Sequence, residues 1–404
     1  MRNRIRKIGT LALAGMMALG MSMTAMAADM NGENGVIGEF TGQPAVQESS
    51  VTFYKEITAF NPAGSDVYAP AVTYRYSIEP AAGGHEITDY AGVKATVKAG
   101  LAGAAITGSV AWTNEEKLDT SAEGTANRKP IEISFENVSW NGAGVYRYEI
   151  TETAPSYAAS GLTEGDGDHI RYLDVYVKDA ADAGYEIYGY VCFANDVDID
   201  AEAAAKSEGF VNADSLAADQ YHTYDLEVTK TVVNDKAMND HDFPFTVAFT
   251  PADGLNTANI KLDTAVNDDA ALGNGYAGSL STDTPRLQNA GSVKYIGIPC
   301  GTKVEVNETV DAAGATYQVT TTQADVNVDE TITGTAEGVD SGKAVVNAQR
   351  ISGLETKTVD FTNTLLLISP TGIALRFAPY ILLLGAGLVI LVLGRIRKCR
   401  AEEN

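Results

Sequence analysis

Val359-Asp-Phe-Thr-Asn-Thr-Leu365 alternates apolar and polar residues with the period of a β-strand. Successive side chains of a strand point to opposite faces, so Asn363 shares a face with Val359, Phe361 and Leu365. The apolar composition of this face predicts contact with a hydrophobic core. Burying an amide without a hydrogen-bond partner costs about 1–3 kcal/mol. Asn363 therefore needs a hydrogen-bond partner inside the protein.

Short alternating runs of the same kind recur along the chain, separated by Gly, Asn and Asp clusters. Val72–Ile78 and Phe243–Phe249 are examples. Strands of this length and spacing are typical of β-sandwiches. We expect an all-β protein made of two tandem immunoglobulin-like β-sandwich domains, over residues 51–222 and 223–366. A flexible lead-in, residues 28–50, precedes them.

Both ends of the chain have the composition of targeting segments. Residues 1–27 combine a basic start, an apolar stretch and Ala25-Met-Ala27, which predicts a secretory signal peptide. Residues 367–404 contain 21 mostly apolar residues, 373–393, and about 20 suffice to cross a bilayer. A basic tail follows and predicts a cytoplasmic end. We expect a secreted precursor that is held in the membrane transiently.

Charge and motif content exclude several classes of function. The formal net charge is −24, which argues against nucleic acid as a partner, because phosphates require a basic surface. The four histidines show no metal-ligand spacing, and no phosphate loop or nucleophile elbow occurs. We therefore expect no metal, no cofactor and no enzymatic turnover of an external substrate.

An internal repeat carries three polar residues in the same order. Val51-Thr-Phe-Tyr-Lys55-Glu-Ile57 matches Leu226-Glu-Val-Thr-Lys230-Thr-Val232. A Thr-Glu-Thr sequence at Glu152 matches Asn-Glu-Thr at Glu308, and Phe210-Val-Asn212 matches Phe361-Thr-Asn363. The repeat places one Lys, one Glu and one Asn in each predicted domain: Lys55, Glu152 and Asn212, then Lys230, Glu308 and Asn363.

Strand parity puts every member of these two trios on an apolar face. Buried amines and carboxyls need one another, and two arrangements satisfy this requirement. One is a buried Lys–Glu ion pair with an amide beside it. The other is a Lys–Asn isopeptide bond, because burial favours a neutral amine that can attack the amide and a protonated carboxyl that can polarise it.

These residues resemble a known family, the sortase-assembled major (backbone) pilins of Gram-positive bacteria. The similarity is to the streptococcal T-antigen type, with tandem isopeptide-bonded immunoglobulin-like domains of the collagen-adhesin B type. Tyr148-Glu-Ile-Thr-Glu152-Thr-Ala-Pro155 is close to the E-box of that family. The resemblance implies the bonds Lys55–Asn212 and Lys230–Asn363, formed autocatalytically with Glu152 and Glu308 as catalytic acids. The second E-box departs from the pattern, since Val304 replaces the usual aromatic residue and no Ala-Pro follows.

Ile368-Ser-Pro-Thr-Gly372 resembles the sortase signal of this family, and the apolar span and basic tail that follow strengthen the match. Ile368, Ser369, Pro370, Thr371 and Gly372 would then form the motif, with cleavage after Thr371. Lys206 is our candidate for the acceptor lysine on the next subunit. The alternative for Lys206 is a solvated loop lysine.

The resemblance implies a structural role, as the shaft subunit of a covalently polymerised, wall-anchored pilus at the surface of a Gram-positive bacterium. The expected partners are a sortase, other copies of the chain, accessory pilins and peptidoglycan. A monomeric wall-anchored adhesin on the same scaffold is the alternative. A membrane protein that retains the span 373–393 as its anchor is a third possibility.

Overall fold

The structure is a computed structural model that describes residues 49–88, 94–165, 167–180, 183–198, 206–212, 216–308, 317–324, 329–333, 335–337, 342–347, 357–365, 380, 382–393 and 395. The predicted signal peptide and the motif at residues 368–372 lie outside these residues. Residues 382–393 are helical. Within the described residues, no helix is both long and apolar enough to cross a membrane.

Strands dominate the described chain, which confirms the predicted all-β class. The alternation seen in the sequence accounts for them: in β17 (Phe243–Thr250), Phe243, Phe245, Val247 and Phe249 are buried and their neighbours are not. Aromatic and β-branched residues suit such half-buried strands. The short helices are α2 (Tyr157–Ser160) and the 3₁₀ turns η1 (Lys236–Met238) and η2 (Thr257–Asn259).

One 11-stranded sheet runs along the whole body, and two six-stranded sheets pack against it. The long sheet contains β1 (Ser50–Phe60), β7 (Ala105–Ile106), β10 (Thr125–Ser134), β12 (Leu162–Thr163), β15 (Gly209–Phe210), β16 (Asp219–Val233), β18 (Asp263–Val266), β21 (Ser292–Pro299), β23 (Tyr317–Ala324), β25 (Thr335–Glu337) and β27 (Lys357–Leu365).

The two facing sheets cover different parts of the long sheet. The first facing sheet contains β3 (Val72–Pro80), β6 (Lys98–Ala99), β8 (Ser109–Trp112), β11 (Gly144–Thr153), β13 (Ile170–Asp179) and β14 (Tyr185–Phe193). The second contains β17, β19 (Ala270–Ala271), β20 (Arg286–Leu287), β22 (Lys303–Glu308), β24 (Asp329–Thr333) and β26 (Gly342–Asn347). Two small two-stranded sheets pair β2 (Val67–Tyr68) with β9 (Lys117–Leu118) and β4 (Glu86–Thr88) with β5 (Lys94–Thr96).

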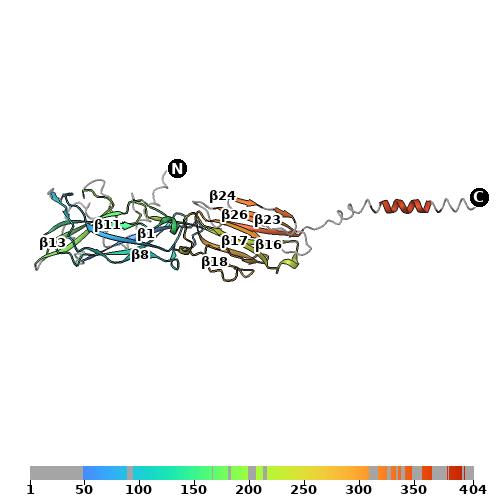
Figure 1. Cartoon of the computed structure of the whole chain (residues 1–404), viewed down its shortest axis with the longest axis horizontal. Helices are drawn as coiled ribbons and strands as arrows, with labels where there is room; N and C mark the ends of the chain where they lie inside the picture. Colours follow the sequence, from blue (N-terminus) through green and yellow to red (C-terminus); the bar gives the residue numbers. More distant parts are fainter. Residues whose placement is uncertain are drawn as a thin grey trace, which may run out of the picture.

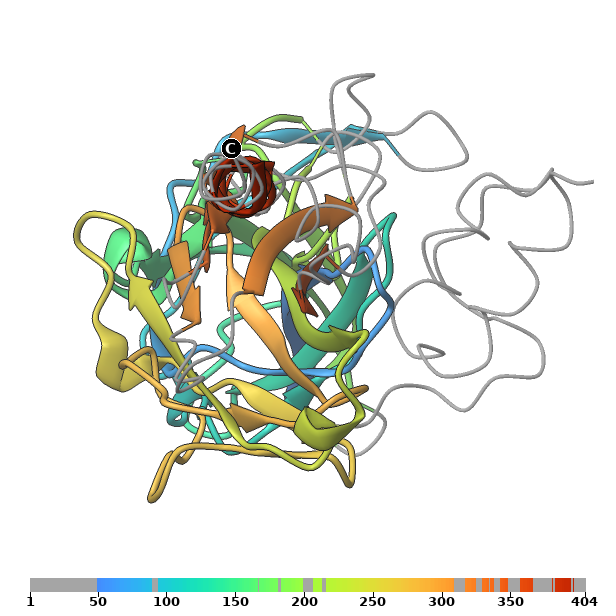
Figure 2. The ribbon, with the colours of Figure 1, turned by 90° about the vertical axis from the view of Figure 1, so that its right-hand side faces the viewer.

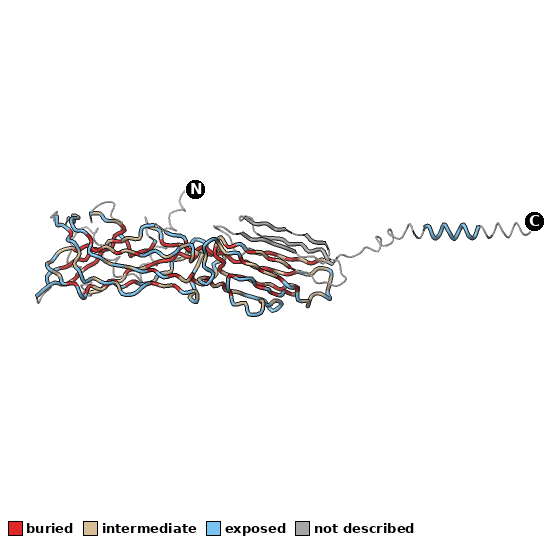
Figure 3. Tube along the Cα trace, viewed as in Figure 1, coloured by how far each residue is buried: buried red, intermediate tan, exposed pale blue. Residues whose placement is uncertain are grey.

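Each facing sheet encloses its own hydrophobic core against the long sheet. The first core includes Phe53, Tyr74 and Tyr148, and the second includes Val228 and Phe361. We name the two units the first and the second sandwich. They lie end to end in Figure 1, and the view along the long axis in Figure 2 looks from the second sandwich toward the first. Figure 3 shows buried residues running through the interior of both.

A single strand, β16, joins the two sandwiches. Its first residues pair in parallel with β1, and its second half pairs in parallel with β27. The predicted domain boundary, after His222, therefore falls inside a continuous strand. A buried cluster braces this joint, where Asn61 Nδ2 donates to Asp225 Oδ1 at 2.8 Å and Lys294 Nζ lies 3.0 Å from Asp225 Oδ2.

Candidate functional site

Two buried lysine centres occupy corresponding places in the two sandwiches. The first centre is Lys55, Glu152 and Asp219, and the second centre is Lys230, Glu308 and Asn363. Every one of these residues is at most 3% exposed. In each centre the long sheet supplies the lysine and the Asx residue, and the facing sheet supplies the glutamate.

Strand register makes the two centres equivalent. β1 and the start of β16 run parallel, and the residue two positions after Lys55 pairs with Asp219. β16 and β27 also run parallel, and the residue two positions after Lys230 pairs with Asn363. Asp219 therefore holds in the first sandwich the place that Asn363 holds in the second.

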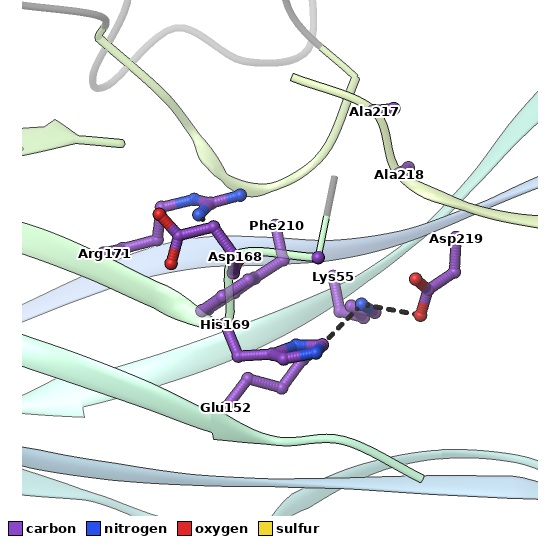
Figure 4. A pocket seen from close by; sticks show the side chains of 10 residues that line it. Lys55, Glu152, Asp168, His169, Arg171, Phe210, Ala217, Ala218 and Asp219 are labelled. Carbon is purple, nitrogen blue, oxygen red and sulfur yellow. Dashed lines mark hydrogen bonds and ion pairs between the residues drawn. The ribbon is translucent and has the colours of Figure 1, made fainter. Parts of the chain in front are cut away.

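In the first centre the Lys55 ammonium lies between two carboxylates. Its Nζ is 3.0 Å from Glu152 Oε1 and 3.0 Å from Asp219 Oδ2, as the dashed lines of Figure 4 mark. The same Nζ lies 4.2 Å from the centroid of the Tyr74 ring. One cation thus faces two anions where little water reaches, so the remaining carboxylate oxygens need other donors.

Hydroxyl and backbone donors satisfy those oxygens. Tyr74 OH donates to Asp219 Oδ2 at 2.8 Å, and the Gly165 N–H donates to Asp219 Oδ1 at 3.1 Å. Tyr76 OH donates to Glu152 Oε2 at 2.7 Å. Burial, together with the adjacent carboxylates, raises the pKa of both the Tyr74 and the Tyr76 phenol. Both phenols therefore stay protonated and available as donors.

The first centre also reaches the surface through a histidine. His169 Nδ1 lies 3.3 Å from Glu152 Oε1, and His169 Nε2 lies 2.9 Å from Glu164 Oε1. A small pocket lined by His169, Phe210 and other residues opens onto Lys55, and Figure 4 shows the histidine ring beside Glu152. A small molecule released at Lys55 could leave through this opening.

The second centre is drier. Lys230 Nζ lies 2.8 Å from Glu308 Oε1, and Asn363 Nδ2 donates to the same oxygen at 2.7 Å. Glu308 Oε2 and Asn363 Oδ1 have no hydrogen-bond partner among the described residues. The lysine Nζ lies 4.4 Å from the centroid of the Phe243 ring, where the first centre has Tyr74.

Burial drives the second centre toward its uncharged form. Desolvation lowers the pKa of Lys230 to about 8, although Glu308 opposes the shift. Desolvation also raises the pKa of Glu308, although Lys230 and Asn363 oppose that shift. Both directions favour a neutral amine beside a protonated carboxyl. This is the state in which a lysine can attack a carbonyl that an acid polarises.

The predicted placement of Asn212 beside Lys55 is wrong. Phe210 pairs with Lys55, but the chain leaves the strand after Phe210 and rejoins it at Asp219. Asn212 is exposed, and its Nδ2 donates to Glu56 Oε1 at 2.9 Å on the other face of β1. Its Oδ1 accepts from the Ala218 N–H at 2.7 Å, so Asn212 links the two ends of the segment between Phe210 and Asp219.

Sequence reasoning missed Asp219 and the groups that surround it. The pattern did hold a signal, because Asp219 shares strand parity with Tyr221, which is fully buried. The other five trio residues, Lys55, Glu152, Lys230, Glu308 and Asn363, are buried at the two centres as parity predicted.

Lys206, the candidate acceptor, lies on the first sandwich away from both centres. It is exposed and forms an isolated antiparallel bridge with Phe193 at the end of β14. Partial burial lowers the pKa of its amine below the usual lysine value. A lysine with a lowered pKa is a better nucleophile near neutral pH.

Comparisons with known proteins give low-identity similarities over most of the chain. Residues 224–364 match the family model described as "Domain of unknown function (DUF7601)". No curated protein matches. The major pilin of Streptococcus pyogenes is similar at 17% identity, covering 79% of this chain and 99% of that chain, with a TM-score of 0.41.

Two further solved structures are also similar to this chain. The T-13 major pilin of Streptococcus pyogenes has 18% identity over 79% of this chain and 100% of its own, with a TM-score of 0.37. A Mobiluncus mulieris adhesin containing disulfide, isopeptide and ester cross-links has 14% identity over 79% and 99%, with a TM-score of 0.28. The solved structures to which this chain is similar therefore include major pilins and a cross-linked adhesin.

Proposed function

We propose that the chain is a shaft subunit of a surface pilus whose two sandwiches are each locked by a lysine amide bond. One observation carries this proposal: a buried Lys, a Glu and an Asx residue meet at the same strand register in both sandwiches. A buried Lys–Glu ion pair alone does not require an Asx residue at one fixed register beside the lysine. A covalent bond between the first and last strands of a sandwich does require it.

In the second centre, the reaction joins Lys230 to Asn363. The ammonium passes a proton to Glu308, and the neutral amine attacks the Asn363 side-chain carbonyl. Protonated Glu308, which lies beside the amide nitrogen, protonates that nitrogen as it leaves and takes up the proton that the attacking nitrogen loses. The C–N bond to Lys230 Nζ forms, the C–N bond to the original amide nitrogen breaks, and ammonia departs.

In the first centre the partner is Asp219, and the released molecule is water. The amine of Lys55 attacks the Asp219 carboxyl carbon, Glu152 transfers the protons, and one carboxyl oxygen leaves as water. The two bonds together therefore remove one water and one ammonia. The bonds implied by the family resemblance, Lys55–Asn212 and Lys230–Asn363, would instead remove two ammonia molecules.

Assembly would follow from the terminal motif. A sortase would cleave the bond between Thr371 and Gly372 and transfer the Thr371 carbonyl to the Lys206 amine of another copy. The exposure of Lys206 and its lowered pKa support this choice of acceptor. Repetition of this step would make a homopolymer, with peptidoglycan as the final acceptor.

Mass spectrometry of the full chain tests the internal bonds. Tryptic digestion should yield one linked peptide pair containing Lys55 and Asp219 and another containing Lys230 and Asn363. The first pair should lack one water and the second one ammonia. Unlinked peptides of full mass at both centres would overturn the proposal.

Expression in a Gram-positive host with a matching sortase tests the polymer. We expect a ladder of species that resists boiling in detergent, and we expect the Lys206→Arg variant to lose it. Lys178→Arg, which changes an exposed lysine on the same sandwich, is the matched control and should keep the ladder. A linked but monomeric wild-type chain at the surface would favour the wall-anchored adhesin instead.

A further inference from the structure

The buried acid of the first centre is connected to solvent by two side chains. Glu152 Oε1 lies 3.3 Å from His169 Nδ1, and His169 Nε2 lies 2.9 Å from Glu164 Oε1. The side-chain exposure rises along this chain of contacts, from 1% at Glu152 to 26% at His169 and 46% at Glu164. The three groups therefore form a path for protons between the first centre and the surface.

This path has room for an additional proton. Both ring nitrogens of His169 face carboxylate oxygens, and a neutral imidazole has only one N–H to donate. A second ring proton, or a proton on either carboxyl, would complete both hydrogen bonds. An imidazole can accept and release a proton at either ring nitrogen, so a proton can pass between the two carboxyls through the ring.

The two centres need different numbers of protons to react. In the second centre, transfer of one proton from Lys230 to Glu308 leaves amine, acid and amide all neutral. In the first centre the same transfer leaves Asp219 as a carboxylate, which repels an attacking amine. For Lys55, Glu152 and Asp219 all to be neutral at once, the first centre must gain one additional proton.

We infer that His169 lends this additional proton to the first centre through Glu152 and takes it back when the bond has closed. This role of His169 rests on the proposed Lys55–Asp219 bond. With both acids protonated, the amine displaces the Asp219 hydroxyl, which leaves as water with one amine proton. Glu152 keeps its proton and returns it to His169, so the relay is unchanged at the end.

The second centre has no such connection in the described structure. Glu308 is fully buried, and its Oε2 has no hydrogen-bond partner among the residues described. The side chains that correspond to Tyr74 and Tyr76 by register are Phe243 and Phe245. The centre that holds the aspartate therefore has a proton relay, and the centre that holds the asparagine has none in the described residues. This agrees with the number of protons that each centre needs in order to react.

The other charged groups near His169 are committed elsewhere or lie beyond Glu152. Lys55 and Asp219 lie behind Glu152, and Asp168 and Arg171 line the same pocket. The Arg171 guanidinium donates to the carbonyls of Gly209, Asp168 and Ile170. Tyr157, whose ring stacks on His169, has a pKa raised mainly by burial and stays uncharged.

The test compares His169→Gln with His85→Gln in the full chain. His85 is a matched control because it also lies between two carboxylates, 2.8 Å from Asp196 and 3.3 Å from Asp198, away from both centres. Each protein is made by cell-free translation, and aliquots are digested over time to quantify both linked peptides. His169→Gln should slow the first link about a hundredfold, the usual size of a general acid–base contribution. The second link and the His85→Gln variant should keep wild-type rates.

The pH profile separates a proton loan from a packing role. In the wild type, formation of the first link should slow as the solution becomes more basic, because the additional proton becomes scarcer, while formation of the second link should not. His169→Gln should remove this dependence. Adding Asp219→Asn to His169→Gln should restore the first link, now with loss of ammonia, because an amide needs no additional proton.

Three outcomes would overturn this inference while leaving the proposed function intact. They are a His169→Gln chain with the wild-type rate and pH profile for the first link, a wild-type first link independent of pH, and a double variant that stays slow. Failure of both links in the wild type would instead overturn the proposed function. If His169→Gln alone failed to fold, shown by loss of the second link as well, Glu164→Gln would provide the same comparison from the exposed end of the relay.

Discussion

The two lysine centres share one geometry and differ in almost every surrounding side chain. The first centre holds an aspartate, two tyrosine hydroxyls and a histidine path to the surface. The second holds an asparagine, has a phenylalanine ring beside its lysine, and has carboxyl and amide oxygens without partners among the described residues. One additional negative charge on the strand partner accounts for the difference, because a buried carboxylate requires donors that a buried amide does not.

This contrast also shows which part of the design is fixed. Lysine, glutamate and the register of the paired strands are common to both centres. The choice between aspartate and asparagine varies with the polarity of the facing sheet. Each centre is thus a matched set, and changing one member without the others should leave a measurable defect.

The largest expected effect comes from removing a lysine. Lys230→Ala should abolish the second link, retain the ammonia and lower the free energy of unfolding by about 5 kcal/mol, the loop-closure value for a loop of this length. Denaturant unfolding with mass spectrometry measures both. Lys303→Ala, at an exposed lysine on the strand that carries Glu308, should change neither. An ammonia deficit in Lys230→Ala would contradict the choice of nucleophile.

The next effect decides which Asx residue serves the first centre. Asp219→Ala should eliminate the first link and cost about 5 kcal/mol by the same loop argument. Asn212→Ala should leave that link in place and cost only about 1–2 kcal/mol, from its hydrogen bonds to Glu56 and Ala218. Peptide mapping of the two variants distinguishes them. The reverse result would restore the Lys55–Asn212 pairing.

A third effect appears in the pH dependence of an unlinked second sandwich. In Asn363→Ala, Lys230 cannot form its bond and keeps a folded pKa near 8, below the ordinary 10.5. Between these values the unfolded chain binds the proton that the folded chain lacks, so stability should rise with pH, by roughly 3 kcal/mol at most.

Calorimetry between about pH 8 and 10 measures this rise, since the rise lies between the folded and the ordinary pKa of Lys230. The raised pKa of Glu308 acts in the opposite sense at lower pH, where stability falls as pH rises through its folded value. The linked wild type should lack the alkaline rise, because an amide nitrogen does not titrate there. An equal rise in both proteins would argue that Lys230 remains a free amine.

The smallest effect makes the first centre resemble the second. Tyr74→Phe and Tyr76→Phe each remove a hydroxyl that donates to a buried carboxylate. Each should cost about 1–3 kcal/mol before the link forms and should slow the first link, while leaving the second unchanged. Tyr185→Phe, at an exposed tyrosine, is the control for both stability and linking rate. Unaltered stability in the Tyr74 and Tyr76 variants would show that those hydroxyls are dispensable.

Strand parity was sufficient to predict much of this arrangement. It placed Lys55, Glu152, Lys230, Glu308 and Asn363 on buried faces, because the period of a strand is a local property of the sequence. The alternating runs likewise predicted the all-β class.

Parity failed where the chain leaves a strand and returns to it. Phe210 pairs with Lys55, yet the residue that pairs two positions after Lys55 is Asp219 rather than Asn212. The length of the segment between Phe210 and Asp219 depends on tertiary contacts, here the hydrogen bonds from Asn212 to Glu56 and Thr58 of β1. His169 was missed for a related reason, since its role depends on a neighbouring strand.

β16 gives the proposed fibre an unusual response to stretching. Once both amides exist, a pull applied at Asn363 passes to Lys230, along β16 to Asp219, and from there to Lys55. A strand already rises about 3.3 Å per residue, and a fully extended chain reaches only about 3.3–3.6 Å. The segment between the two bonds therefore has almost no slack, and the loops that each bond closes can melt without lengthening it. This part of each subunit would behave as an inextensible cord.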